Sequence, residues 1–496
     1  LIVTTGSGDP GDTIEPVVAE FSVNPTTVNT NDPITISYTV TDETSLKQVE
    51  LYRKIDGGDW SLIETKDISG TSASGSFTNS ISSAGTYWYG MHVVDEAGNV
   101  GYEPITPGPI SVEVNSSSDS LQKLRASSDG HYLETTDGEP FMWIAEVLWK
   151  MPQVADRDDV TFVLDELSKP EHKYSVIYSV VVMSRQQDIL HPTNAYGDQP
   201  FYGGVSPDFN SPKVVTGGDP DNPNDYWDHL DFMVRETEER GMYFVLVPQW
   251  SNMYINAAWG RNDVDKMDAA TARSYGEFLG DRYKNENHII WMLGGDGGDP
   301  FENGTAAIHR AQAEGILKGV TGCTTDCPAY NEPSPLWDEV LMTFHAKSGT
   351  RSSQLFGTGD AWINIDACYS CTSRSGDYFG VLTDAYNQAA PMPTIESEGH
   401  GFWDDANQVW TGLEGTRAFP YMHYFSGGIG PSNLDEYWHF GPGWRDNINL
   451  PERNWVGYMR QIMSSIDWYK LVPDNGIILS NRGTLWAEII AARSSD

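Results

Sequence analysis

The stretch DYWDHLDFMVRETEERGMYFVLVPQW, residues 225–250, decides the fold class of this 496-residue chain. Its first part repeats apolar residues at the three- and four-residue spacing of an amphipathic helix, and Gly241 ends that pattern. MYFVLVPQW follows as a short, almost unbroken apolar run, which is typical of a parallel strand buried on both faces. A helix that leads directly into a buried strand is the repeating unit of α/β proteins.

The same alternation extends over residues 121 to about 475. Eight parallel strands that alternate with helices predict an α/β fold of the (β/α)8 type, the TIM barrel, whose active site lies at the carboxyl ends of the strands. A doubly wound sheet fits less well, because no glycine-rich phosphate loop follows the first run. The expected strands are FMWIAEV (141–147), YSVIYSVVVM (174–183), MYFVLVPQW (242–250), HIIWMLGGD (288–296), VLMTFH (340–345), AWINIDAC (361–368), PTIESE (393–398) and SGGIG (426–430), and the expected helices cover 158–167, 225–241, 269–283, 306–317 and 454–469.

Residues 17–114 alternate apolar and polar residues instead, as in ITISYTV (34–40) and GTYWYGMHVVD (85–95). Turn clusters rich in Gly, Ser and Asp separate these segments, so they predict a small all-β sandwich that precedes the barrel. The segment resembles the immunoglobulin-like modules of secreted bacterial enzymes, and both a spacer and a carbohydrate-binding module fit it. Outside it, we expect linkers at 1–16 and 115–121, a catalytic barrel over 122–475, and the start of a truncated C-terminal β-structure at 476–496.

Composition narrows the function classes. Asp and Glu number 70 against 31 Lys and Arg, and the resulting net charge of −39 repels nucleic-acid backbones and anionic membranes. No apolar stretch reaches the eighteen or so residues of a membrane-spanning helix. Aromatic residues make up 12% of the chain, and flat rings stack on sugar faces. An oligosaccharide or polysaccharide is therefore the expected partner, and a nucleic acid is not expected.

Four cysteines form two close pairs, Cys323 with Cys327 and Cys368 with Cys371. Such pairs form either disulfides or a zinc knuckle. The opening residues 1–16 look like an exposed linker that remains after removal of a signal peptide, which predicts a secreted, periplasmic or cell-surface protein, the last attached through this linker. In an oxidising compartment we expect all four cysteines in disulfides, with open connectivity and no metal.

Two carboxylates follow strands on opposite sides of the expected barrel. Asp296 closes the fourth run and Glu398 the seventh, so both are expected at the barrel mouth. Glycoside hydrolysis uses such a pair: a protonated acid donates to the leaving oxygen while the ionised partner attacks the anomeric carbon. Taken singly, each carboxylate also fits a turn or helix cap. Glu396, on the same strand face as Glu398, is the alternative nucleophile or its supporting partner.

Six stretches stand in a specific order and spacing: SSDGHYLETTDGEPFMWIAEVLWKM (127–151), PTNAYGDQPF (192–201), NPNDYWDHLDFMVRETEERGMYFVLVPQW (222–250), YGEFLGDRYKNENHIIWMLGGD (275–296), LMTFHAKSGTRSS (341–353) and PMPTIESEGH (391–400). On these stretches the chain resembles the apiosidase-like glycoside hydrolases, family 140 and its relatives, which belong to a clan of retaining barrels. The resemblance implies hydrolysis of plant or algal polysaccharide by double displacement, with Asp296 as acid/base, Glu398 as nucleophile and no cofactor.

The chain departs from the family pattern after the first strand, where AEVLW (145–149) replaces Gly-Asp-Thr-Ala-Trp. A longer Glu146 therefore stands where relatives have a substrate-contacting Asp. For the aromatic and histidine candidates near strand ends, a role in the core is the alternative. Two other classes stay open, a carbohydrate-binding barrel without catalysis and a polysaccharide lyase. The substrate-binding candidates are Glu146, Trp149, Asn194, Tyr196, Asp198, Trp250, His345, Glu396 and Trp438.

A last segment, DPDNPND from Asp219, resembles a calcium loop at first sight. It lacks the glycine at position six and the glutamate at position twelve of such a loop. Asn224 is a good helix cap, so capping of the following helix is the expected role, and no metal site is predicted.

Overall fold

Two compact units make up the computed structural model. One comprises Leu1–Ser120 with Val215–Asn224, and the other comprises Leu121–Val214 with Asp225–Asp496. The segment Val215–Asn224, which falls inside the range expected for the barrel, thus groups with the N-terminal unit. The structure describes residues 12–29, 33–56, 58–81, 85–103, 108–115, 121–183, 193–203, 207–250, 253–254, 266–295, 297–347, 349–369, 377–399, 403–404, 409–410, 414–433, 436–448, 453–480 and 489–495.

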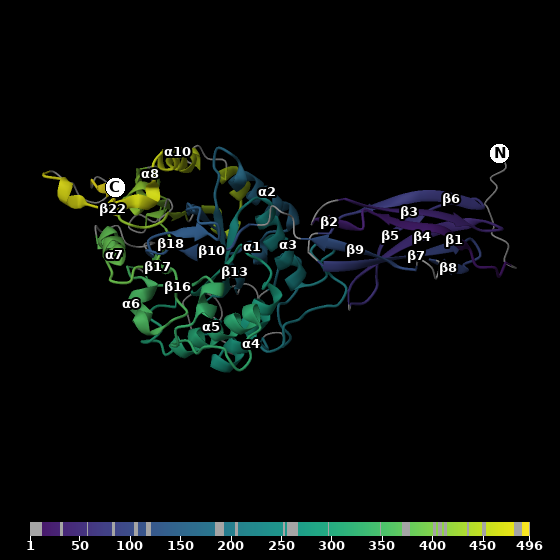
Figure 1. Ribbon diagram of the computed structural model, residues 1–496, viewed down its shortest axis with the longest axis horizontal. Helices are drawn as coiled ribbons and strands as arrows, with labels where there is room; N and C mark the ends of the chain where they lie inside the picture. The colour runs from purple at the N-terminus through teal and green to yellow at the C-terminus, as the bar shows by residue number, and fades with distance from the viewer. Residues whose placement is uncertain are drawn as a thin grey trace. The chain divides into compact units, whose positions relative to one another are not determined.

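The N-terminal unit consists of two packed sheets, with strand orders β1-β3-β6 and β2-β9-β7-β4-β5 (Figure 1). Alternate residues of β3 (Ile34–Thr41) are buried, as the period of its sequence predicts. Residues of both sheets share one apolar core. Its other strands are β1 (Val17–Asn24), β2 (Thr27–Asn29), β4 (Leu46–Ile55), β5 (Ser61–Asp67), β6 (Ser72–Asn79), β7 (Gly85–Asp95), β8 (Val100–Tyr102) and β9 (Ile110–Asn115).

The second unit is built on eight parallel strands, which fall in or beside the eight runs that the sequence predicts. Their ladders form two sheets, of order β16-β15-β14-β13-β12-β21 and β17-β18. The longest strands are buried on both faces, so the domain is TIM-barrel-like. The strands are β12 (Ala145–Val147), β13 (Val176–Val182), β14 (Tyr243–Gln249), β15 (Ile289–Gly294), β16 (Met342–His345), β17 (Asp366–Tyr369), β18 (Thr394–Glu398) and β21 (Ser432–Asn433).

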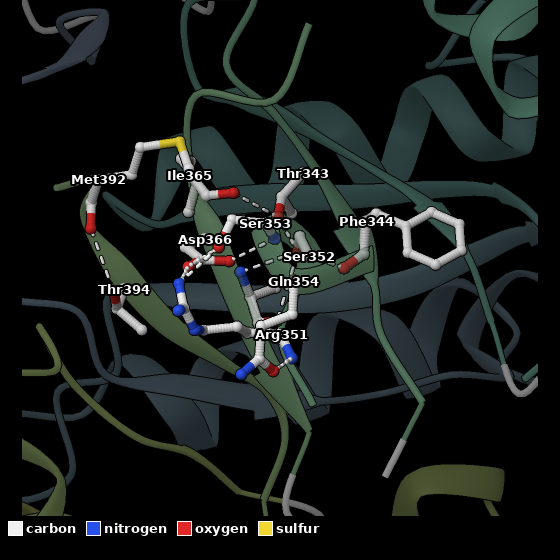
Figure 2. A network of polar contacts seen from close by, with 11 residues as sticks. Thr343, Phe344, Arg351, Ser352, Ser353, Gln354, Ile365, Asp366, Met392 and Thr394 are labelled. Atoms are coloured by element: carbon white, nitrogen blue, oxygen red, sulfur yellow. Dashed lines mark hydrogen bonds and ion pairs between the residues drawn. The ribbon is translucent and has the colours of Figure 1, made fainter. Parts of the chain in front are cut away.

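Single hydrogen bonds join the two sheets where no ladder runs. Between β16 and β17, the Ser352 hydroxyl donates to the carbonyl of Phe344 at 2.8 Å and accepts from the amide of Ala367 at 3.0 Å (Figure 2). On the other side, the amide of Ile429 donates to the carbonyl of Thr394 at 2.9 Å, just before β21. A side-chain hydroxyl on one side and a backbone amide on the other thus join the two sheets.

The eighth strand differs from the prediction, which placed it at SGGIG, 426–430. Gly427 and Gly430 have φ angles of 98° and 151°, and a side chain at Gly430 would collide with the carbonyl of Trp143. These glycines make a tight turn against the first strand. The strand itself begins two residues later, at Ser432.

The five expected helices are all present, and capping carboxylates mark where α3 and α4 begin. Asp225, rather than the expected Asn224, caps α3 (Tyr226–Glu239), because its carboxylate accepts from the amides of Trp227 and Asp228. Asp268 forms a capping box at the start of α4. The other helices are α1 (Met151–Val154), α2 (Arg157–Ser168), α4 (Ala269–Arg282), α5 (Ala306–Thr321), α6 (Ser352–Phe356), α7 (Asp377–Tyr386), α8 (Glu414–Phe425), α9 (Trp444–Asn447) and α10 (Arg453–Ser464), and the remaining short strands are β10 (Leu124–Ala126), β11 (Leu133–Thr135), β19 (Trp403–Asp404), β20 (Val409–Trp410), β22 (Leu471–Pro473) and β23 (Ala492–Ser494).

The cysteines correct one expectation. Cys323 and Cys327 form a disulfide, whereas Cys368 is a buried free thiol. Cys368 lies inside β17 and packs against Leu382 and Phe419, so it acts as a small apolar core residue. Cys371 lies outside the described residues. Among the helices that the structure describes, none is long and apolar enough to cross a membrane.

Candidate active site

Three strands bring side chains to one carboxylate. Glu398, the last residue of β18, is only 6% exposed. The indole N–H of Trp149 donates to its Oε1 at 3.2 Å. Nε2 of His345, the last residue of β16, lies 3.3 Å from its Oε2. Trp149 follows β12, so residues distant in sequence meet at the carboxyl ends of the strands, where barrel enzymes carry their chemistry.

Aromatic rings enclose this carboxylate. The rings of Trp149 and Trp250 lie 5.0 Å apart, and His345 contacts Trp250 at 5.3 Å and Tyr369 at 4.7 Å, measured between ring centroids. Trp149 and Trp250 are almost completely buried, so they pack against each other rather than forming an open platform. Tyr369 is the last residue of the sixth strand, and this place at a strand end is the sequence signal that could have predicted it.

Glu396 lies in the same strand as Glu398, but a β-bulge separates them. In the register with β17, Glu396 pairs with Cys368 and Glu398 with Tyr369, so Ser397 is an extra residue. The simple alternation that puts both glutamates on one face therefore does not hold across Ser397. Glu396 is completely buried, and its carbonyl accepts a hydrogen bond of 2.9 Å from the hydroxyl of Tyr178.

Trp438 lies beside the end of the first strand. The Nζ of Lys150 is 5.3 Å from the centroid of its indole ring, and the Lys150 amide donates to the Trp438 carbonyl at 3.3 Å. Burial, and then the charge of Lys150, lower the pKa of His439. Lys150, which was not among the predicted site residues, is a buried cation next to Trp149 in the sequence.

Three candidates from the loop after the second strand make contacts within that loop and with the start of α2. The side-chain oxygen of Asn194 accepts from the amides of Tyr196 and Asp198, which closes a local turn. The Tyr196 hydroxyl accepts from the amide of Arg157 at 3.0 Å, at the start of α2. The described contacts of this turn are therefore structural. Glu146 is completely buried within β12, where it pairs in register with Ile177.

Asp296 lies outside the described residues, but the chain leading to it is defined. Gly294, the last residue of β15, and Gly295 have φ angles of 98° and 125°. A side chain at Gly294 would lie 2.7 Å from the ring of Phe344 on β16. Glycine is therefore required where the chain leaves the fourth strand. This accounts for the Gly-Gly pair that precedes Asp296.

Two groups of potential metal ligands occur among the described residues, and neither includes the residues around Glu398. Glu238, Glu286 and His288 form one group, and Asp12, Asp42 and Asp95 form the other. In the second group, the Asn99 backbone and side-chain N–H groups already bind both oxygens of Asp95.

Comparison with known proteins agrees with this architecture. A solved glycoside hydrolase family 5 protein from Bacteroides vulgatus has a TM-score of 0.61 at 24% identity, over 76% of this chain and 80% of that one. A second solved glycoside hydrolase has a TM-score of 0.60 at 22% identity, over 76% of this chain and 82% of that one. At these identities the two structures show a shared glycoside hydrolase fold. No functionally curated protein matches the chain.

One family matches by sequence over most of the chain. The sequence model described as "Apiosidase-like, catalytic domain" matches residues 127–470. This range contains all eight parallel strands and the residues that surround Glu398. The chain therefore belongs to the apiosidase-like catalytic-domain family.

Proposed function

We propose that this protein hydrolyses glycosidic bonds by a retaining double displacement, with Glu398 as the nucleophile and Asp296 as the acid/base. The observation that carries the proposal is the buried Glu398 carboxylate at the end of β18, with the Trp149 N–H on one oxygen and His345 beside the other. Family membership supports the same activity.

The contacts of Glu398 suit a nucleophile. The Trp149 N–H holds Oε1 and fixes the orientation of the carboxylate. One Glu398 oxygen attacks the anomeric carbon while the glycosidic oxygen leaves with a proton from Asp296, which gives a glycosyl-enzyme ester. Asp296 then takes a proton from water, and that water displaces Glu398 with net retention. This mechanism requires the two carboxyl groups to lie about 5–5.5 Å apart.

We further propose that the substrate is a plant or algal polysaccharide and that the protein acts outside the cytoplasm. The disulfide between Cys323 and Cys327 supports an oxidising compartment. The N-terminal all-β unit is proposed to be an immunoglobulin-like module that serves as a spacer. Lys150 and Trp438, beside Trp149, are proposed to contact the sugar next to the scissile bond.

Turnover of a panel of oligosaccharides and aryl glycosides tests the proposal. Glu398→Ala should lose at least about 10⁴-fold in kcat on every substrate, and azide should restore slow turnover with an inverted product. Asp296→Ala should keep a fast first step on substrates with a good leaving group, then stall at deglycosylation. Glu396→Gln, a buried carboxylate on the same strand, is the matched control. If Glu396→Gln gives the nucleophile phenotype instead, the assignment is wrong.

The product separates the reaction classes. NMR of the first product should show the anomeric configuration of the substrate. An inverted product from the native enzyme would exclude the retaining mechanism. An unsaturated product would identify a lyase, and sugar binding without turnover would identify a binding protein.

A further inference from the structure

A second cluster of chemistry-bearing side chains lies at the opposite end of the barrel from Glu398. His288 immediately precedes β15, Glu286 lies in the turn before it, and Glu238 lies in the last turn of α3. One ligand atom from each residue lies within 4.8 Å of the other two. Nδ1 of His288 is 3.8 Å from Oε1 of Glu238 and 3.9 Å from Oε2 of Glu286.

The imidazole of His288 is held as a ligand would be. Its side chain is 0% exposed, and Nε2 lies 3.0 Å from the carbonyl of Val234. A carbonyl only accepts, so Nε2 carries the ring hydrogen and donates it. In the neutral ring, Nδ1 then carries the lone pair. A histidine that binds a metal through one ring nitrogen usually donates the N–H of the other ring nitrogen to a carbonyl or a carboxylate.

Nδ1 of His288 has no hydrogen-bond partner among the described residues, although it is fully buried. It faces two carboxylates, and among the described residues the one hydrogen bond to their side chains is that from the amide of Leu121 to Oε1 of Glu238. The ion pairs described for Glu238 and Glu286 involve His288 alone. The neighbouring acid, Asp231, is instead neutralised by Arg282 at 2.6 Å. A cation between the three acceptors would satisfy all of them.

We propose that Glu238, Glu286 and His288 bind a divalent cation of the zinc class, and that this ion is structural. Two carboxylates and one imidazole suit Zn²⁺, whereas Ca²⁺ prefers six to eight oxygen ligands. Zinc bonds of about 2.0–2.1 Å place tetrahedral ligand atoms about 3.4 Å apart, so Nδ1 of His288 needs to approach each carboxylate oxygen by only about 0.5 Å. The side chains of Glu238 and Glu286 are 26% and 33% exposed, which gives the ion and a completing water access from solvent.

The ion would tie three segments together at the amino ends of the strands. Glu238 also accepts from the amide of Leu121 at 3.3 Å, at the first residue of the second unit. The ion would therefore link the end of α3 to the entry of β15. By fixing Glu238, it would also hold the carboxylate that binds the amide of Leu121. In barrel enzymes this end contributes stability, and catalysis takes place at the other end.

Zinc binding by the whole chain tests the proposal independently of glycosidase activity. After removal of metals with a chelator, Zn²⁺ should bind at this site with a Kd in the micromolar range or below, and should raise the Tm by about 2–5 °C. Glu286→Gln and Glu238→Gln should each weaken binding at least about tenfold and abolish the rise in Tm. Glu239→Gln, the adjacent carboxylate of α3, which pairs with Arg235, is the matched control and should bind Zn²⁺ like the native chain.

His288→Gln should also lose binding, but it also removes the hydrogen bond to Val234. The variants of the two partly exposed carboxylates therefore decide the outcome. If the chain binds no Zn²⁺ at about 100 μM, the proposal is overturned. A proton shared between Glu286 and His288 would then hold these side chains together. Binding that survives both carboxylate substitutions would also overturn it. Ca²⁺ binding as tight as that of Zn²⁺ would exclude the zinc class.

Discussion

At the scale of single residues, the contact between Trp149 and Glu398 is the most informative. Trp149 contributes a ring to the aromatic cluster and an N–H to the carboxylate, and these two roles can be separated. Phenylalanine keeps an aromatic ring but has no N–H. The consequences for catalysis and for stability therefore differ.

Trp149→Phe should lower kcat by about 10–100-fold with little change in KM, because Glu398 loses the donor that orients it for attack. The Tm should fall by only a few degrees, since a ring still fills the site. Trp250→Phe is the control, because Trp250 packs in the same cluster without a described bond to Glu398. Equal loss of kcat in both variants would mean that packing, and not the N–H, supports the carboxylate.

Some features of single residues could be predicted from the sequence, and others could not. Glu398 was predicted at the end of the seventh strand because a short run typical of a buried strand ends there, and the structure places it at that strand end. The local turn formed by Asn194 and Asp198 was not predicted, because side-chain bonds to nearby amides leave no periodic pattern. The convergence of Glu238 with His288 was not predicted either, because tertiary packing alone joins residues 50 positions apart.

At the scale of elements, helices α4 and α5 lie side by side (Figure 1). Gly276 and Gly280 of α4, and Gly315 and Gly319 of α5, face the backbone of the other helix. A side chain at Gly315 would lie 2.1 Å from the carbonyl of Arg273, and one at Gly319 would lie 2.3 Å from that of Glu277. Glycine at four-residue spacing on both helices therefore permits this approach.

Gly315→Ala should destabilise the protein by about 1–3 kcal/mol, because two backbones must separate to admit the methyl group. This is the net loss, after the gain of about 1 kcal/mol that alanine offers over glycine in a helix. Gly380→Ala in α7 is the control: nothing lies within 4 Å of the added atom, so it should be neutral or slightly stabilising. Urea unfolding measures both, and similar midpoints in the two variants would contradict the close-packing argument.

Helices and long strands could be predicted because their periodicity is local. The seam between β16 and β17 could not, because Ser352 bridges two strands through one hydroxyl rather than through a ladder (Figure 2). The buried pair of Arg351 and Asp366, 2.8 Å apart, holds the same seam. Such contacts depend on where the short helix α6 packs in the folded protein, and no sequence pattern within a single element predicts that position.

At the scale of the whole molecule, three buried histidines should make the native state less stable in acid. Burial lowers the pKa of His309 to about 3, that of His423 to about 3 and that of His229 to about 4. All three lie in the barrel unit. In the unfolded chain each would titrate near its ordinary value of about 6.5. The unfolded state therefore binds more protons than the native state at every pH between these values.

Stability must then fall as the pH drops below about 6.5, because protons favour the state that binds more of them. Each histidine should cost roughly 2–3 kcal/mol at pH 4.5 relative to pH 7, as an upper bound for complete burial. Urea midpoints at pH 7.0, 5.5 and 4.5 measure this loss. His309→Gln cannot gain a proton, so its midpoint should decline less steeply with acid than that of the native chain. Parallel declines in the two proteins would show that His309 is protonated in the native state, or that carboxylates dominate the acid response.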